Sequence, residues 1–123
     1  EQKHSFVVSA IISSCLFGFW HMIGPVRNYV DETMSMNGMI AYIAMLVITS
    51  TLVGFKFAML TKMTGSLYMA MGDHFVNNTI VNLLHVVSDT GADEMMVVRV
   101  AIAQSVSFIL VLLCYIRRCR KTL

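Results

Sequence analysis

Four long apolar stretches, separated by short polar segments, dominate this sequence of 123 residues. They run over residues 6–24, 38–60, 67–87 and 95–116. At about 1.5 Å per residue, each stretch is roughly as long as the hydrocarbon core of a bilayer is thick. Because lipid offers no partners for backbone N–H and C=O groups, spanning segments of this length must be helical. The sequence therefore predicts an all-α integral membrane bundle of about four transmembrane helices, forming one transmembrane domain over residues 1–123.

The composition excludes several other classes of protein. Only 13% of the residues are charged and 57% are apolar, whereas soluble domains are about 25% charged. A disordered chain, a soluble globule and a basic nucleic-acid-binding domain all need more polar material than this. The three cysteines lie in apolar stretches or in the basic tail, so a disulfide framework is not expected.

Positive charge is concentrated at alternate ends of the predicted helices. If all four stretches cross the bilayer, one face carries seven of the nine Lys and Arg residues, namely Lys3, Lys56, Lys62, Arg117, Arg118, Arg120 and Lys121. Arg27 and Arg99 fall on the opposite face. Because cytoplasmic segments are enriched in Lys and Arg, both ends of the chain are predicted to be cytoplasmic. Lys56 lies near the end of its stretch and is expected to extend its side chain to the interface.

Polar side chains interrupt the middle of the third stretch. On a helix with about 100° per residue, four of them share a stripe about 80° wide, namely His74, Asn78, Asn82 and His85. Asp73 and Asn77 fall to one side of this stripe. Because polar groups at membrane depth cost about 3 kcal/mol on insertion scales, the stripe is expected to face protein or a water-filled cavity.

Two interpretations of these polar residues stay open. Any one of them alone is explained by hydrogen bonding between helices, which contributes about 1 kcal/mol or less. Asn82 and His85, nearer the membrane edge, fit this structural role best. The whole set on one stripe, together with His21 at the end of the first stretch, favours a functional site.

Two motifs in these stretches resemble those of a known family. Residues 17–21, Phe-Gly-Phe-Trp-His, are similar to the FxxxH motif of the CAAX protease and bacteriocin-processing (CPBP, or Abi) family. Residues 74–78, His-Phe-Val-Asn-Asn, are similar to its HxxxN motif. The Thr64-Gly65-Ser66 turn before the second motif also resembles the family, and the resemblance covers residues 6–87.

The resemblance implies an intramembrane endopeptidase with a water-filled cavity in a helical bundle. His21 would position or polarise the attacking water, while His74 and Asn78 would hold the substrate carbonyl and stabilise its oxyanion. An Asn N–H is a suitable donor for such a charge, and the i,i+4 spacing places both side chains on one face. The expected partners are a peptide or prenylated protein substrate and the lipid bilayer, with no nucleic acid.

The chain departs from the family pattern at its start. The family's first motif, EExxxR, supplies a glutamate base, and residues 1–5 do not match it. Asp73 is the one carboxylate within a predicted span, and it points away from the stripe. We therefore expect this chain to be the C-terminal portion of a longer peptidase and to be inactive in isolation. The alternative is a non-catalytic immunity or scaffold protein with the same fold.

Metal and haem sites are further alternatives. No cofactor is expected, because the sequence has no HExxH spacing of the kind that holds catalytic zinc. Zinc held by His21, His74 and His85 is the weaker possibility. A small haem-binding or quinone-binding bundle would use His21 with His74 or His85, and it would leave the Phe17 and Asn78 spacings as coincidence.

Overall fold

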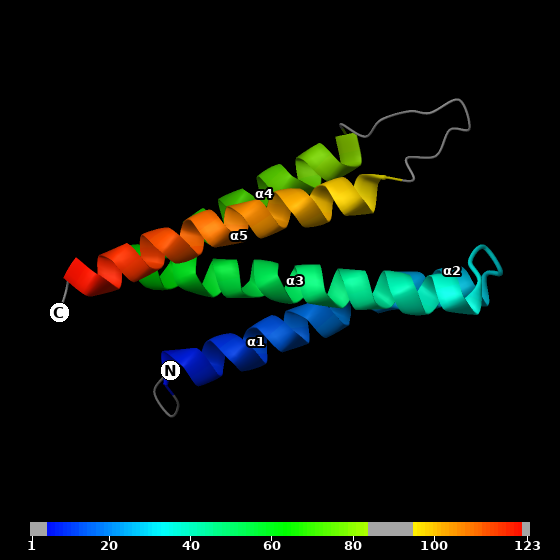
Figure 1. Ribbon diagram of the computed structural model, residues 1–123, viewed down its shortest axis with the longest axis horizontal. Helices are drawn as coiled ribbons and strands as arrows, with labels where there is room; N and C mark the ends of the chain where they lie inside the picture. Colours follow the sequence, from blue (N-terminus) through cyan, green and yellow to red (C-terminus); the bar gives the residue numbers. More distant parts are fainter. Residues whose placement is uncertain (1–4, 84–94, 122–123) are drawn as a thin grey trace. The chain divides into compact units, whose positions relative to one another are not determined.

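A computed structural model describes residues 5–83 and 95–121, which contain five helices and no strand (Figure 1). The helices are α1 (Phe6–Trp20), α2 (Ile23–Val30), α3 (Met36–Thr64), α4 (Tyr68–Leu83) and α5 (Met96–Lys121). In these described parts, three segments are long and apolar enough to cross a membrane, namely Phe6–Val30, Met36–Thr64 and Met96–Arg120. The prediction of an all-α integral membrane protein is confirmed.

The chain divides into two compact units, Glu1–Phe55 and Lys56–Leu123. The first unit contains α1, α2 and most of α3. The second contains the last part of α3 together with α4 and α5. FxxxH therefore belongs to the first unit and HxxxN to the second.

The first apolar stretch does not form one helix over residues 6–24. α1 ends at Trp20, and the His21 and Met22 N–H groups bond to the carbonyls of Gly18 and Phe19, each at 3.1 Å. Such i,i+3 bonds tighten and end a helix. The polar segment between the first two predicted stretches is also partly helical, because α2 extends to Val30. Pro25 fits the first turn of α2, where the N–H that proline lacks would have no partner within the helix.

Small residues allow α1 and α3 to approach closely within the first unit. A Cβ atom added at Gly54 would lie 2.8 Å from the Ser14 Cα atom, and Ser14 is fully buried. Ser50 and Gly54 have the small-xxx-small spacing that lets helices approach closely. Gly54 makes that contact, and Ser50 is buried at 8% exposure.

We expect Gly18→Ala to destabilise the first unit by about 1–3 kcal/mol, the usual cost of overpacking. The new methyl group would meet the Thr51 hydroxyl and lie 2.9 Å from the Val47 carbonyl oxygen, which belongs to the backbone. Unfolding in detergent measures the change. Gly24→Ala is the matched control, because nothing lies within 4 Å of its Cβ position. Equal stability of the two variants would contradict the close contact.

The turn between α3 and α4 depends on a glycine. Gly65 has φ +69°, a left-handed conformation that other residues adopt at a cost, and its N–H donates to the Thr61 carbonyl at 2.9 Å. The Ser66 hydroxyl then accepts a bond from the Tyr68 N–H at 3.2 Å, close to the start of α4. These contacts reverse the chain after Thr64. The turn between α3 and α4 therefore covers residues 65–67, whereas the predicted stretches left residues 61–66 between them.

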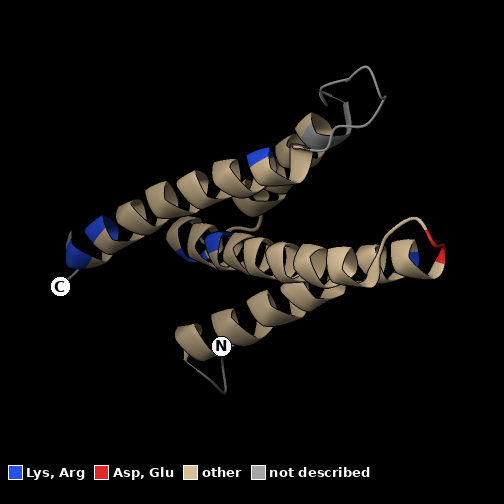
Figure 2. Ribbon diagram, turned by 45° about the vertical axis from the view of Figure 1, so that its right-hand side comes forward, with Lys and Arg blue, Asp and Glu red and all other residues tan. Residues whose placement is uncertain are grey.

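The last two helices also differ from the predicted boundaries. α4 was expected over residues 67–87, and 68–83 are helical; residues 84–87 lie outside the described part of the chain. α5 was expected to end at 116 but continues to Lys121. Its last turns carry Arg117, Arg118 and Arg120 (Figure 2). Cations at a helix C-terminus are stabilised by the helix dipole, which explains why the basic tail is helical.

Candidate functional site

The FxxxH motif is held together by contacts between its first and last residues. The His21 Nδ1–H donates to the Phe17 carbonyl oxygen at 2.8 Å, and the two rings meet edge to face with centroids 4.9 Å apart. Phe17 offers this oxygen because α1 ends here and the His21 backbone N–H bonds to Gly18 instead. The bond fixes the imidazole tautomer, with the proton on Nδ1 and the lone pair on Nε2.

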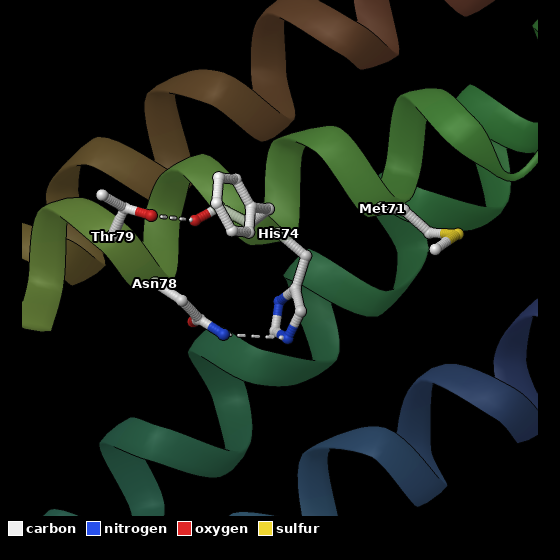
Figure 3. A pocket seen from close by; sticks show the side chains of 5 residues that line it. Met71, His74, Asn78 and Thr79 are labelled. Atoms are coloured by element: carbon white, nitrogen blue, oxygen red, sulfur yellow. Dashed lines mark hydrogen bonds between the residues drawn. The ribbon is translucent and has the colours of Figure 1, made fainter.

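His74 and Asn78 of the HxxxN motif lie side by side on α4. The Asn78 side-chain amide donates to His74 Nε2 at 3.2 Å (Figure 3). Both side chains line an open groove of about 440 Å³, together with Met71, Phe75 and Thr79. The predicted pairing of His74 and Asn78 on one face of a helix is confirmed.

A ring from α3 packs against this pair. The Phe57 ring meets the His74 imidazole edge to face, with centroids 5.6 Å apart and an interplanar angle of 82°. The His74 side chain is half-buried, and that of Asn78 is exposed. The groove therefore presents an amide and an imidazole on a mainly apolar surface.

The second unit also contains a buried ion pair between α3 and α4. The Lys56 ammonium of α3 is fully buried and lies 2.7 Å from the Asp73 carboxylate of α4. The expectation that Lys56 extends to the interface is wrong. The Asp73 carboxylate balances the positive charge of the ammonium, and other polar side chains accept its hydrogen bonds. The side chain therefore does not need to reach water.

Polar side chains of α5 complete this cluster, which we call the lysine network and define as Lys56, Asp73, Asn77 and Gln104. Lys56 donates to the Gln104 side-chain oxygen at 2.7 Å and to the Ser107 hydroxyl at 3.2 Å. The Gln104 amide in turn donates to the Asn77 side-chain oxygen at 2.5 Å. Asp73 and Asn77 were expected to turn away from the stripe, and here they point to α3 and α5.

The comparison with family models bears on both motifs. A model described as type II CAAX prenyl endopeptidase Rce1-like matches residues 1–80, a range that contains the FxxxH and HxxxN motifs. The chain belongs to this family of prenyl endopeptidases. No curated protein and no solved structure matches it.

The structure describes all three residues that the resemblance implied to be catalytic, His21, His74 and Asn78. It brings His74 and Asn78 together in the second unit, and it places His21 in the first unit. The Asn82 side chain and all of His85 lie outside the described residues. Residues 5–83 and 95–121 hold no group of three His, Cys, Asp or Glu side chains arranged for a metal ion.

The lysine network was missed from the sequence, although a signal for it was present. Lys56 and Asp73 are opposite charges in consecutive apolar stretches, and Gln104 is a lone amide in the next one. Polar groups that each need a partner at membrane depth are expected to find one another. The position of Lys56 near the end of its stretch suggested water as its partner instead.

Proposed function

We propose that the protein is an intramembrane endopeptidase of the CAAX prenyl protease type, with His21, His74 and Asn78 as its catalytic residues. The observation that carries the proposal is the family match across both motifs, combined with the His74–Asn78 pair on an open groove. The substrate is a peptide segment of a prenylated or other membrane-associated protein. The apolar lining of the groove, with Met71 and Phe75, suits a substrate that approaches from the bilayer.

The chemistry assigned to each residue follows from its donor and acceptor atoms. The Asn78 amide and the His74 imidazole would hold the scissile carbonyl and stabilise the oxyanion that forms when water adds to it. His21, with its proton fixed on Nδ1, offers the Nε2 lone pair to the attacking water. The water gives a proton to the base as its oxygen bonds to the carbonyl carbon. The C–N bond then breaks, and the base passes that proton to the departing amine.

The reaction also needs a carboxylate base, which the EExxxR motif would supply in the family, and residues 1–5 do not match that motif. In the described parts of α3, α4 and α5, the one carboxylate is that of Asp73, and it is paired with Lys56. Asp73 is therefore not proposed as the base.

The test of the proposal is hydrolysis of a farnesylated CAAX peptide by the protein expressed from its complete reading frame and reconstituted in lipid vesicles. We expect His21→Ala to lower kcat by a factor of about 10²–10⁴, the usual contribution of a positioned acid–base group. Asn37→Ala, at an exposed position at the start of α3, is the control and keeps full activity. Unchanged cleavage by the His21 variant would overturn the proposed role of FxxxH.

We expect cleavage to be independent of added metal. Activity after incubation with 1,10-phenanthroline or EDTA should stay within a factor of about two of the untreated enzyme, because a water activated by carboxylate and imidazole needs no metal ion. Loss of activity on chelation, with recovery on adding Zn²⁺, would instead support the zinc alternative, with His21, His74 and His85 as its candidate ligands.

A non-catalytic binding protein with the same fold is the second candidate. The pairing of Asp73 with Lys56 favours it, because Asp73 is the one carboxylate in the described residues of α3, α4 and α5 and is already bound to an ammonium. Such a protein would bind a membrane partner through the groove. A folded protein from the complete reading frame that cleaves neither prenylated nor unmodified peptides would support this candidate.

A further inference from the structure

α4 carries two i,i+4 pairs of polar residues that are offset by one position. His74 and Asn78 face the groove, whereas Asp73 and Asn77 contact Lys56 and Gln104. Neighbouring positions on a helix differ by about 100° in direction. The direction of one pair is therefore fixed by the direction of the other.

We propose that the lysine network fixes the rotation of α4 about its own axis and thereby holds His74 against Phe57 of α3, with Asn78 beside it. Its four members are positioning residues and do not touch the substrate. Any consequence for catalysis rests on the proposed function, but the rotation of α4 does not.

Apolar packing by itself specifies this rotation poorly. The exposed side chains of α4 include large apolar residues in several directions, such as Tyr68, Met69, Phe75, Val76 and Ile80. In a bilayer, lipid tails are as apolar as these side chains, so turning one apolar face in place of another changes little. Among the α4 side chains whose burial is described, the buried apolar one is that of Ala70, and so small a side chain holds one orientation only weakly.

The ion pair, in contrast, depends on direction. Lys56 is fully buried and its ammonium contacts Asp73, Gln104 and Ser107. Turning α4 by one residue would carry Asp73 away and leave a buried ammonium without its counter-ion, which is strongly unfavourable. Gln104 adds a second point of attachment one turn further along α4, at Asn77. Two anchors on one face resist rotation better than one.

The contact between His74 and Phe57 supplies a readout that does not need activity. An aromatic ring 5.6 Å away shifts the NMR resonances of the imidazole, and Phe57→Leu removes that shift. With histidine isotopically labelled in lipid nanodiscs, His74→Gln identifies the resonance. The chemical shift of this resonance in the wild type marks His74 packed against Phe57. Its chemical shift in Phe57→Leu marks His74 without that contact.

The decisive variant is Lys56→Met combined with Asp73→Leu. Replacing both members of a buried ion pair by apolar residues is often neutral for stability, so the protein is expected to stay folded. The proposal predicts that the His74 resonance moves to its position in Phe57→Leu while the melting temperature changes little. A resonance that stays at the wild-type position in this folded double variant would overturn the proposal, since packing would then set the rotation.

Gln104→Leu is the second variant and keeps the ion pair intact. If the double variant does not fold, Gln104→Leu decides the question, because it removes only the attachment at Asn77. The proposal predicts a His74 resonance that moves part of the way or exchanges between the two positions. A single wild-type resonance would contradict it.

A kinetic measurement separates this proposal from the proposed function. If the protein is a peptidase, the double variant should lose at least tenfold in kcat, because the groove is lined by α4 residues and turns with the helix, away from its wild-type orientation. A wild-type protein without peptidase activity would refute the proposed function. The NMR measurement would still test whether the lysine network sets the rotation of α4.

Discussion

If the proposed function is right, replacing Asn78 by alanine is expected to lower the rate of peptide cleavage by a factor of about 10²–10³, the loss seen when one oxyanion donor is removed. The expected change in stability is small. Asn78 is exposed, and its bond to His74 contributes about 1 kcal/mol or less. Activity should therefore disappear in a protein that still inserts and folds.

The measurement is kcat on a farnesylated peptide, with the protein expressed from its complete reading frame. His74→Ala is expected to give a similar loss. Gly72→Ala is the matched control on the same helix, because open space surrounds its Cβ position. Unchanged turnover in the Asn78 and His74 variants would refute the assignment of HxxxN as the carbonyl-binding part of the site.

The second large effect is on stability, and it follows from the burial of Lys56. Lys56→Met alone should destabilise the protein by about 3 kcal/mol, because the Asp73 carboxylate loses its counter-ion in a largely apolar setting. The estimate lies at the low end of the usual range, since the Asp73 side chain keeps 31% exposure. Asp73→Leu in addition should restore most of the lost stability.

Unfolding in detergent, monitored by circular dichroism, measures this loss. Lys62→Met is the matched control, since Lys62 lies six residues further along α3 and its side chain is exposed. Surface charge interactions contribute about 0–1 kcal/mol, so this variant should change stability little. Equal destabilisation by the two substitutions would show that the buried ion pair has no special role.

The sequence was a good guide where a strong periodic or compositional signal existed. Three of the four predicted stretches correspond to described helical segments long and apolar enough to span a bilayer, because length and hydropathy alone decide this property. The third stretch does not, since the described part of α4 has 16 residues. The pairing of His74 with Asn78 follows from their i,i+4 spacing and is independent of the rest of the fold. Helix ends were predicted less well, as the continuation of α5 to Lys121 shows.

The failures have physical causes at particular residues. The first stretch was predicted to end at residue 24, directly before Pro25, but Pro25 lies in the first turn of α2, where proline is well tolerated. Lys56 could satisfy its charge at the interface or with a partner, and spacing along one helix does not distinguish the two. That choice depends on Asp73 and Gln104, which lie on other helices.

The central claim of the proposed function is that His21 acts in one site with His74 and Asn78. The most direct test combines His21→Cys with Asn78→Cys, after Cys15, Cys114 and Cys119 have been replaced by serine, and treats the protein in membranes with a short bifunctional thiol reagent. The two single cysteine variants are the controls. The proposal predicts an intramolecular cross-link only in the double variant. No cross-link, with both thiols reactive toward a monofunctional reagent, would contradict it.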